Sequence, residues 1–171
     1  MLHYPSEAVV LVIVAAGTGA AAVIDLGTRR VPNVLTMSMA VTGMALAAAG
    51  LGRVGLGASI AGCVLGAAMM LPGHVLGATG AGDVKLLAAA GALLGPALTV
   101  RAFVATALAG GVIALIVAVH RGRIARTCKA TARLVASGGG SAPEIKSTQA
   151  NNRFAYAPAI AIGVTLVAIG W

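Results

Sequence analysis

The chain has 171 residues, of which 59% are hydrophobic and only 9% are charged, and its mean hydropathy is +0.98. A soluble domain carries about a quarter charged residues, so this composition excludes a water-facing surface over most of the chain and indicates a membrane protein. The net charge is +8, the basic residues lie between apolar segments, and the sequence has no stripe of aromatic and basic residues. This pattern argues against a nucleic-acid partner and favours contact with the lipid bilayer.

Apolar stretches of nearly membrane-spanning length follow one another along the chain. A span needs about 20 residues, with a range of about 17–25. The six predicted spans cover residues 8–24, 34–51, 54–73, 84–99, 102–119 and 154–171. The predicted fold class is therefore all-α, a polytopic membrane protein of about six transmembrane helices in a single domain, residues 1–171. Its 24 glycines predict helices that pack closely through small residues.

Basic residues gather in alternate breaks between these spans. The breaks after the first, third and fifth spans hold ten of the twelve lysines and arginines, and the other two breaks hold only Arg53 and Arg101. The positive-inside rule then predicts that the odd-numbered breaks face the cytoplasm and that both termini lie on the outer side. The longest break, residues 120–153, is predicted to be a basic cytoplasmic loop.

The two cysteines indicate neither a disulfide nor a zinc site. Cys63 lies in an apolar run, Cys128 lies in the basic loop, and neither belongs to a CxxC pair. No metal and no other cofactor is predicted.

Two of the four acidic residues are placed unusually. Glu7 and Glu144 lie in polar surroundings, as solvated charges would. Asp25 ends the first span, and Asp83 opens the fourth within Gly80-Ala81-Gly82-Asp83, so the predicted topology places both at the cytoplasmic face. Ionisable groups at membrane depth are costly and usually functional, which favours a shared task for this pair.

Two carboxyl groups held close together can hydrolyse a peptide bond without a metal ion. Because both cannot ionise cheaply, one keeps a proton that polarises the peptide carbonyl, and the other activates water. Gly80 and Gly82 have no side chains and would let an extended substrate approach closely. Pro32 suits the first turn of the second helix, and the Asn33 side chain can bind local backbone or substrate.

Simpler interpretations of the same acids are open. Asp25 could be an interfacial acid paired with Arg29 or Arg30. Asp83 could cap the N-terminus of the fourth helix, where acids are favoured. Together the two acids could also form the proton relay of a small transporter, although neither lies near mid-membrane.

A third possible function is a non-catalytic assembly subunit that docks through its basic loop. Two nearby residues are interpreted without a role in chemistry. His74 is expected to be structural, and Lys85 is expected to extend to the inner interface rather than to tune the acids.

The segments around both aspartates resemble the signatures of the type IV prepilin peptidase family, membrane aspartic proteases of the GxGD class. The first, DLGTRRVPN from Asp25 to Asn33, is similar to the family's Asp, basic residues and Ile/Val-Pro-Asn. The second, GAGDVK from Gly80 to Lys85, is similar to GxGD followed by a hydrophobic residue and Lys. The late segment FAYAPAIA, residues 154–161, resembles the start of the family's last span.

The resemblance implies that Asp25 and Asp83 are the catalytic residues of an aspartic endopeptidase in the bacterial inner membrane. Its expected substrates are pilin-like precursors, from which it would remove a short basic leader at the cytoplasmic face. The first break is only a few residues long and lacks CxxC, so the chain resembles the short form of tight-adherence, or Flp-type, pilus systems. No methyltransferase activity is expected, and the oligomeric state is not predicted.

Overall fold

The computed structural model describes residues 5–120 and 156–170. Their regular structure is helical throughout, and its elements are α1 (Pro5–Thr28), α2 (Asn33–Ala48), α3 (Leu56–Val75), α4 (Ala81–Leu94), α5 (Pro96–His120) and α8 (Ala157–Ile169). The prediction of an all-α protein with six helices is confirmed. The predicted basic loop begins at His120, the last residue of α5, and otherwise lies outside the described residues.

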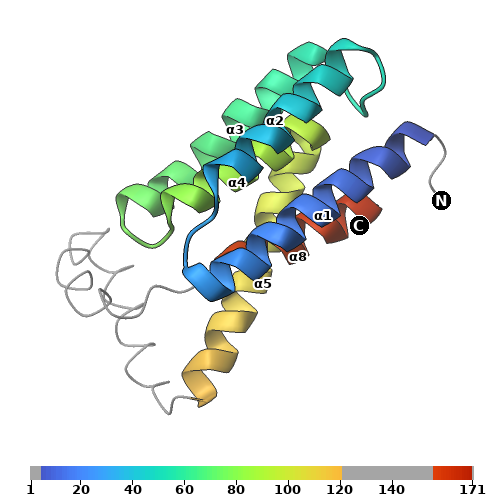
Figure 1. Ribbon diagram of the computed structural model, residues 1–171. Helices are drawn as coiled ribbons and strands as arrows, with labels where there is room; N and C mark the ends of the chain where they lie inside the picture. Colours follow the sequence, from blue (N-terminus) through green and yellow to red (C-terminus); the bar gives the residue numbers. More distant parts are fainter. Residues whose placement is uncertain (1–4, 121–155, 171) are drawn as a thin grey trace.

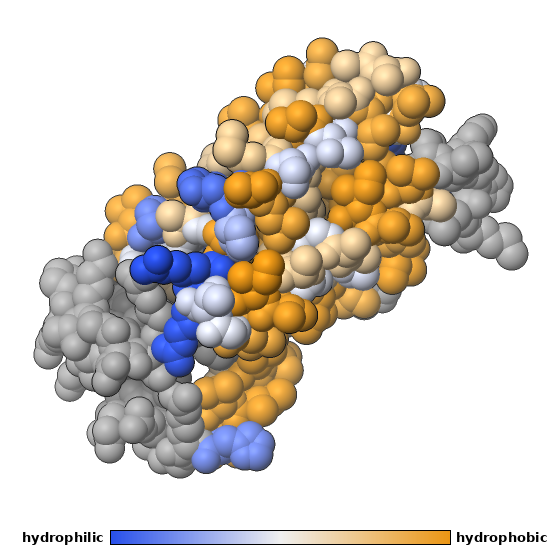
Figure 2. Space-filling view, viewed as in Figure 1, coloured by the Kyte–Doolittle hydropathy of each residue, from blue (hydrophilic) through white to orange (hydrophobic). Residues whose placement is uncertain are grey.

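Three of these helices are long and apolar enough to cross a bilayer, over Glu7–Thr28, Leu56–Val75 and Pro96–Val117. The helices α2, α4 and α8 are shorter, with 16, 14 and 13 residues. Large apolar side chains face outward along the sides of the bundle, and Figure 2 shows them as a broad hydrophobic surface with the hydrophilic residues gathered towards one end. A surface of this kind suits lipid, because soluble proteins rarely expose apolar patches of this extent.

The boundary between α4 and α5 differs from the predicted one. The fourth span was predicted to continue to residue 99 and the fifth to begin at residue 102, whereas α4 ends at Leu94 and α5 begins at Pro96. Gly95, between them, has a φ of +78°, a conformation that favours glycine. Proline follows readily as the first residue of a helix, since its missing N–H has no partner there. Thr99 and Arg101 therefore belong to α5.

Helix α4 is the centre of the bundle. It contacts every other helix in the described part of the chain, and most of its residues are buried. Its closest neighbour is α3, because Gly62 of α3 and Gly91 of α4 face each other so closely that a Cβ on either would overlap the carbonyl oxygen of the other. The hydroxyl of Ser59 adds a hydrogen bond of 2.6 Å to the Ala92 carbonyl. This contact agrees with the close packing that the glycine content predicted.

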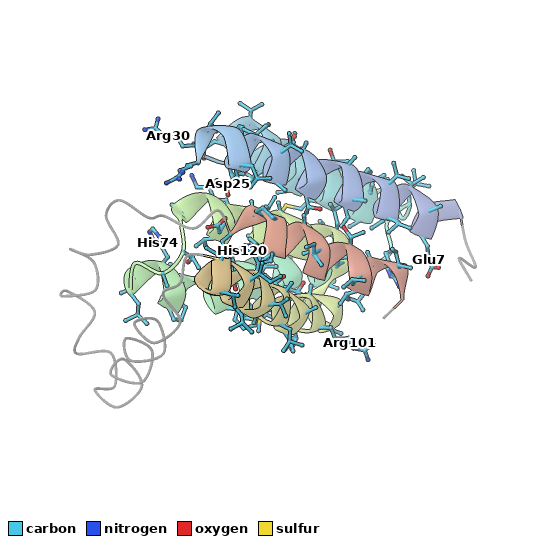
Figure 3. The ribbon with its side chains drawn as sticks, turned by 90° about the horizontal axis from the view of Figure 1, so that it is seen from below. Glu7, Asp25, Arg30, His74, Arg101 and His120 are labelled. Carbon is cyan, nitrogen blue, oxygen red and sulfur yellow. The ribbon has the colours of Figure 1, made fainter. Side chains whose placement is uncertain are left out.

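The helix ends collect at two opposite ends of the bundle. The end of α1 and the starts of α2 and α8 lie together, and the start of α1 lies beside the end of α8 at the opposite end (Figure 1). Figure 3 shows Asp25, Arg30 and His74 towards the first of these ends, which we call the site end, and Glu7 and Arg101 towards the other. The basic residues of the described chain thus divide between the two ends as the orientation prediction requires, while the orientation itself stays a prediction.

The glycine contact between α3 and α4 makes a testable prediction. Gly62→Ala should lower the free energy of unfolding by about 1–3 kcal/mol, because the added methyl group overlaps the Gly91 carbonyl in a closely packed interface. Gly57→Ala in the same helix is the matched control, since its Cβ would meet nothing within 4 Å, and alanine favours helix. Thermal unfolding in detergent measures both. Equal melting temperatures for the two variants would contradict the contact.

Candidate active site

Asp25 is held in the last turn of α1 by the start of another helix. Its side chain is only 6% exposed. The backbone N–H of Ala157, the first residue of α8, donates a hydrogen bond to the Asp25 carboxylate. The first N–H groups of a helix lack partners within the helix, so α8 supplies the donor that an enclosed carboxyl group needs. The positive charge of Arg29, in the turn that follows α1, also acts on Asp25.

Asp83 is held in the same manner by its own helix. It is the third residue of α4, and it too is 6% exposed. Its Oδ2 accepts a hydrogen bond of 2.9 Å from the backbone N–H of Gly80, the N-cap residue. The capping interpretation of Asp83 therefore describes its local geometry correctly. That role fixes the carboxyl at the site end and leaves its other oxygen for further contacts.

The two carboxyl groups lie within electrostatic reach of each other. Asp83 directly precedes the predicted fourth span, residues 84–99, and therefore lies outside the predicted membrane-spanning segments. Burial raises the pKa of Asp83 to about 6; the Gly80 N–H opposes this shift, the charge of Asp25 adds to it, and His74 opposes it. Because the influence of one charge on another falls with distance, the structure brings together the two acids that lie 58 positions apart in the sequence.

His74 and Tyr156 complete the surroundings of Asp83. The Nδ1 atom of His74 lies 3.2 Å from the Thr79 carbonyl oxygen and donates to it, because that oxygen can only accept. Tyr156 immediately precedes α8 and is half-buried, and the charge of Asp83 acts on it. Its ring packs on Gly110 of α5, where an added Cβ would lie 2.9 Å from a ring carbon. Tyr156 was not predicted as a site residue, although it is one of only two tyrosines in the chain.

The connection between α1 and α2 lies against the start of α4. A Cβ added to Gly82 would lie 2.9 Å from the Val31 Cβ. The Lys85 Nζ donates a hydrogen bond of 2.9 Å to the Asn33 Oδ1. Gly82 and Asn33 therefore have partners inside the protein. Pro32 is the N-cap residue of α2, one position before the predicted first turn. This hydrogen bond, which we call the Lys85–Asn33 bridge, was not predicted, because nothing in the sequence pairs these two side chains.

Gly80 differs from Gly82 in its exposure and its neighbour. It is exposed, and a Cβ added to it would lie 3.3 Å from the Asp83 Oδ2. A side chain here would crowd the carboxyl group, so the glycine keeps one side of the acid open. Within residues 5–120 and 156–170, no group of three His, Cys, Asp or Glu side chains is arranged to hold a metal ion.

Comparisons with known proteins add one positive finding. A sequence model of the type IV leader peptidase family matches residues 12–115, which is more than half of the chain. The match contains Asp25 and Asp83 and ends within α5, so α8 and the Ala157 hydrogen bond to Asp25 lie beyond it. No curated protein and no solved structure matches the chain.

The raised pKa of Asp83 predicts a pH-dependent change in stability. Because the folded state holds this proton more tightly than the unfolded state, stability contributed by the protonated acid is lost as the pH rises from about 4 to about 6. Asp83→Asn removes that dependence and keeps an oxygen that can accept from Gly80. At pH 8 the free energy of unfolding of the variant should exceed that of the wild type by on the order of 2 kcal/mol. The variant should therefore have the higher melting temperature.

The two melting temperatures should converge near pH 4, where the wild-type carboxyl is protonated in both states. Thermal unfolding in detergent across pH 4 to 8 measures this difference. A lower melting temperature for Asp83→Asn at pH 8 would mean that the buried carboxylate stabilises the fold.

Proposed function

Because the chain belongs to the type IV leader peptidase family, we propose that it is an aspartic endopeptidase whose catalytic residues are Asp25 and Asp83. Family membership makes it a type IV leader peptidase-like protease. One observation carries the aspartic mechanism. Two buried carboxyl groups from different helices lie at one end of the bundle and act on each other electrostatically. This arrangement suits a pair that shares one proton.

The proposed reaction uses that shared proton twice. The ionised carboxylate takes a proton from water while the water oxygen attacks the peptide carbonyl carbon, and the protonated carboxyl donates its proton to the carbonyl oxygen. The tetrahedral intermediate, a geminal diol, then collapses and the C–N bond breaks. The carboxyl that took the water proton donates it to the leaving amine, and a hydroxyl of the diol returns its proton to the other carboxylate as the new carbonyl forms. The products are a new carboxyl group and a new N-terminal amine, and the pair returns to its starting state.

The proposed substrates are pilin-like precursors, cut at the junction of a short basic leader and a hydrophobic stem. The site end supports this choice, because it is where the apolar sides of the bundle give way to hydrophilic residues (Figure 2). A substrate whose own polarity changes at the cleavage point would place its stem beside the helices and its leader beyond them. We further propose that the site end faces the cytoplasm in a bacterial inner membrane and that the chain has no methyltransferase activity.

A proton relay is not supported by the arrangement of the acids. A transporter of this type holds ionisable residues near mid-membrane, often at broken helices. Asp25 and Asp83 both lie at one end of the bundle, and each accepts a backbone N–H at the start of a helix. They are therefore arranged to work on one substrate at an interface rather than to pass protons between two sides.

The decisive experiment coexpresses the protein with a pilin-like precursor that has a short basic leader. Leader removal is measured as a mobility shift and by sequencing the new N-terminus. Asp25→Asn and Asp83→Asn should each reduce the cleavage rate by about 100- to 10,000-fold, because each removes one partner of the acid–base pair. Neither change alters the shape of the side chain, so both variants should remain in the membrane.

Glu7→Gln is the matched control. It makes the same chemical change in α1, the helix that carries Asp25, but at the opposite end of the bundle (Figure 3). Cleavage by this variant should equal that of the wild type. Undiminished cleavage by Asp25→Asn or Asp83→Asn would remove that residue from the catalytic pair.

A further inference from the structure

The α1–α2 connection and the first turn of α4 touch each other away from the carboxyl groups. The side chain of Val31 covers Gly82, with its Cγ2 3.3 Å and its backbone N 3.4 Å from the position of an added Cβ. On the exposed side of the same contact, Lys85 donates its hydrogen bond of 2.9 Å to Asn33. The bridge therefore joins the residues that follow Asp25 to the helix turn that carries Asp83.

The connection between α1 and α2 is stiff enough for the Lys85–Asn33 bridge to influence the position of Asp25 in the last turn of α1. Arg29 has a φ of +54°, which reverses the chain directly after α1, and its N–H bonds to the Asp25 carbonyl at 2.8 Å. The Thr28 hydroxyl lies within hydrogen-bond distance of the carbonyl oxygens of Ile24, at 2.8 Å, and Arg30, at 3.1 Å. These bonds leave little freedom between the last turn of α1 and the residues at the bridge.

Lys85 is placed to act through Asn33 and not on the acids directly. It lies two residues after Asp83, and two residues turn a helix by about 200°. Its side chain therefore leaves α4 on the side opposite to the buried carboxyl, which agrees with its exposure. An amide oxygen is a suitable partner for an ammonium group, because Lys has three donors and no acceptor.

We propose that Lys85 is a positioning residue: its ammonium group, held by the Asn33 side-chain oxygen, docks the α1–α2 connection onto the first turn of α4 and so sets the separation of the Asp25 and Asp83 carboxyl groups. This role rests on the proposed function of the two acids. It replaces the interpretation of Lys85 as a side chain that only extends to the membrane interface. It also gives Asn33 an intramolecular task in place of contact with substrate.

A double-mutant cycle on cleavage tests the bridge. Lys85→Met and Asn33→Ala should each lower kcat by roughly ten- to a hundredfold, because small misplacements of catalytic groups are costly, and KM should change little. The double variant should be no slower than either single variant, since each removes the same interaction. Lys85→Arg and Asn33→Asp, which keep a donor and an acceptor, should restore most of the rate.

Arg101→Met is the control for loss of a basic side chain, because Arg101 lies at the opposite end of the bundle (Figure 3). Its kcat should equal that of the wild type. Independent losses that multiply in the Lys85→Met/Asn33→Ala double variant would overturn the bridge. A wild-type rate for Asn33→Ala would do the same, because a lysine that only reaches the interface has no need of Asn33.

A second measurement needs no cleavage and separates this proposal from the proposed function. A Cβ added at Gly82 would lie 2.9 Å from the Val31 Cβ. In a Cys63→Ser/Cys128→Ser background, the pair Val31→Cys and Gly82→Cys therefore needs a shift of only about 0.6 Å or a little more to reach the Cβ separation of a disulfide, about 3.5–4.5 Å. Mild oxidation should link them, and adding Lys85→Met should slow the linkage severalfold. Linkage that is absent, or equally fast without Lys85, would overturn the docking role even if both aspartates prove catalytic. Linkage that depends on Lys85 would uphold the docking even if the aspartates prove dispensable.

Discussion

The structure depends on the need of a buried carboxyl group for hydrogen-bond donors. Asp25 and Asp83 are enclosed by apolar helices, where an unpartnered acid would be strongly unfavourable. Each finds its donor in a backbone N–H at a helix start, Ala157 for the first and Gly80 for the second. The Ala157 donor joins the end of α1 to the start of α8, and the Gly80 donor fixes the Asp83 carboxyl at the start of α4. The two acids are thus held at the site end by hydrogen bonds to helix starts.

Close packing around α4 holds that arrangement in place. A helix of 14 residues is short for a bilayer, but α4 contacts every other helix of the described chain. Gly62 and Gly91 let the α3 and α4 backbones touch, and Gly82 does the same for Val31 at the site. Small residues are the means by which helices associate closely where apolar surface alone gives little preference between protein and lipid. The central helix therefore carries Asp83 on a support with few alternative positions.

Asp83 combines a structural role with the catalytic role that we propose for it. Asp83 caps α4, and that cap is what keeps its carboxyl at the site end beside Asp25. Burial raises its pKa into the range where it can both hold and release a proton near neutral pH. A residue that served only as a cap would gain by remaining ionised in water. The enclosure of this cap favours the catalytic interpretation over the purely structural one.

By itself, the sequence determined the helical class, four of the six helix positions to within a few residues, and the two acids as the centre of interest. Hydropathy and the sparsity of charge carry that information, because apolar length and isolated acids are local properties. It misplaced the α4–α5 boundary, because the predicted fourth span ran through Gly95 to Thr99. The positive φ of Gly95 ends α4, and Thr99 belongs to α5. Only the tertiary structure decided which residues meet. The Ala157 donor, the Tyr156 ring near Asp83 and the Lys85–Asn33 bridge join segments far apart in the chain, and such contacts follow from helix packing, which no local pattern encodes.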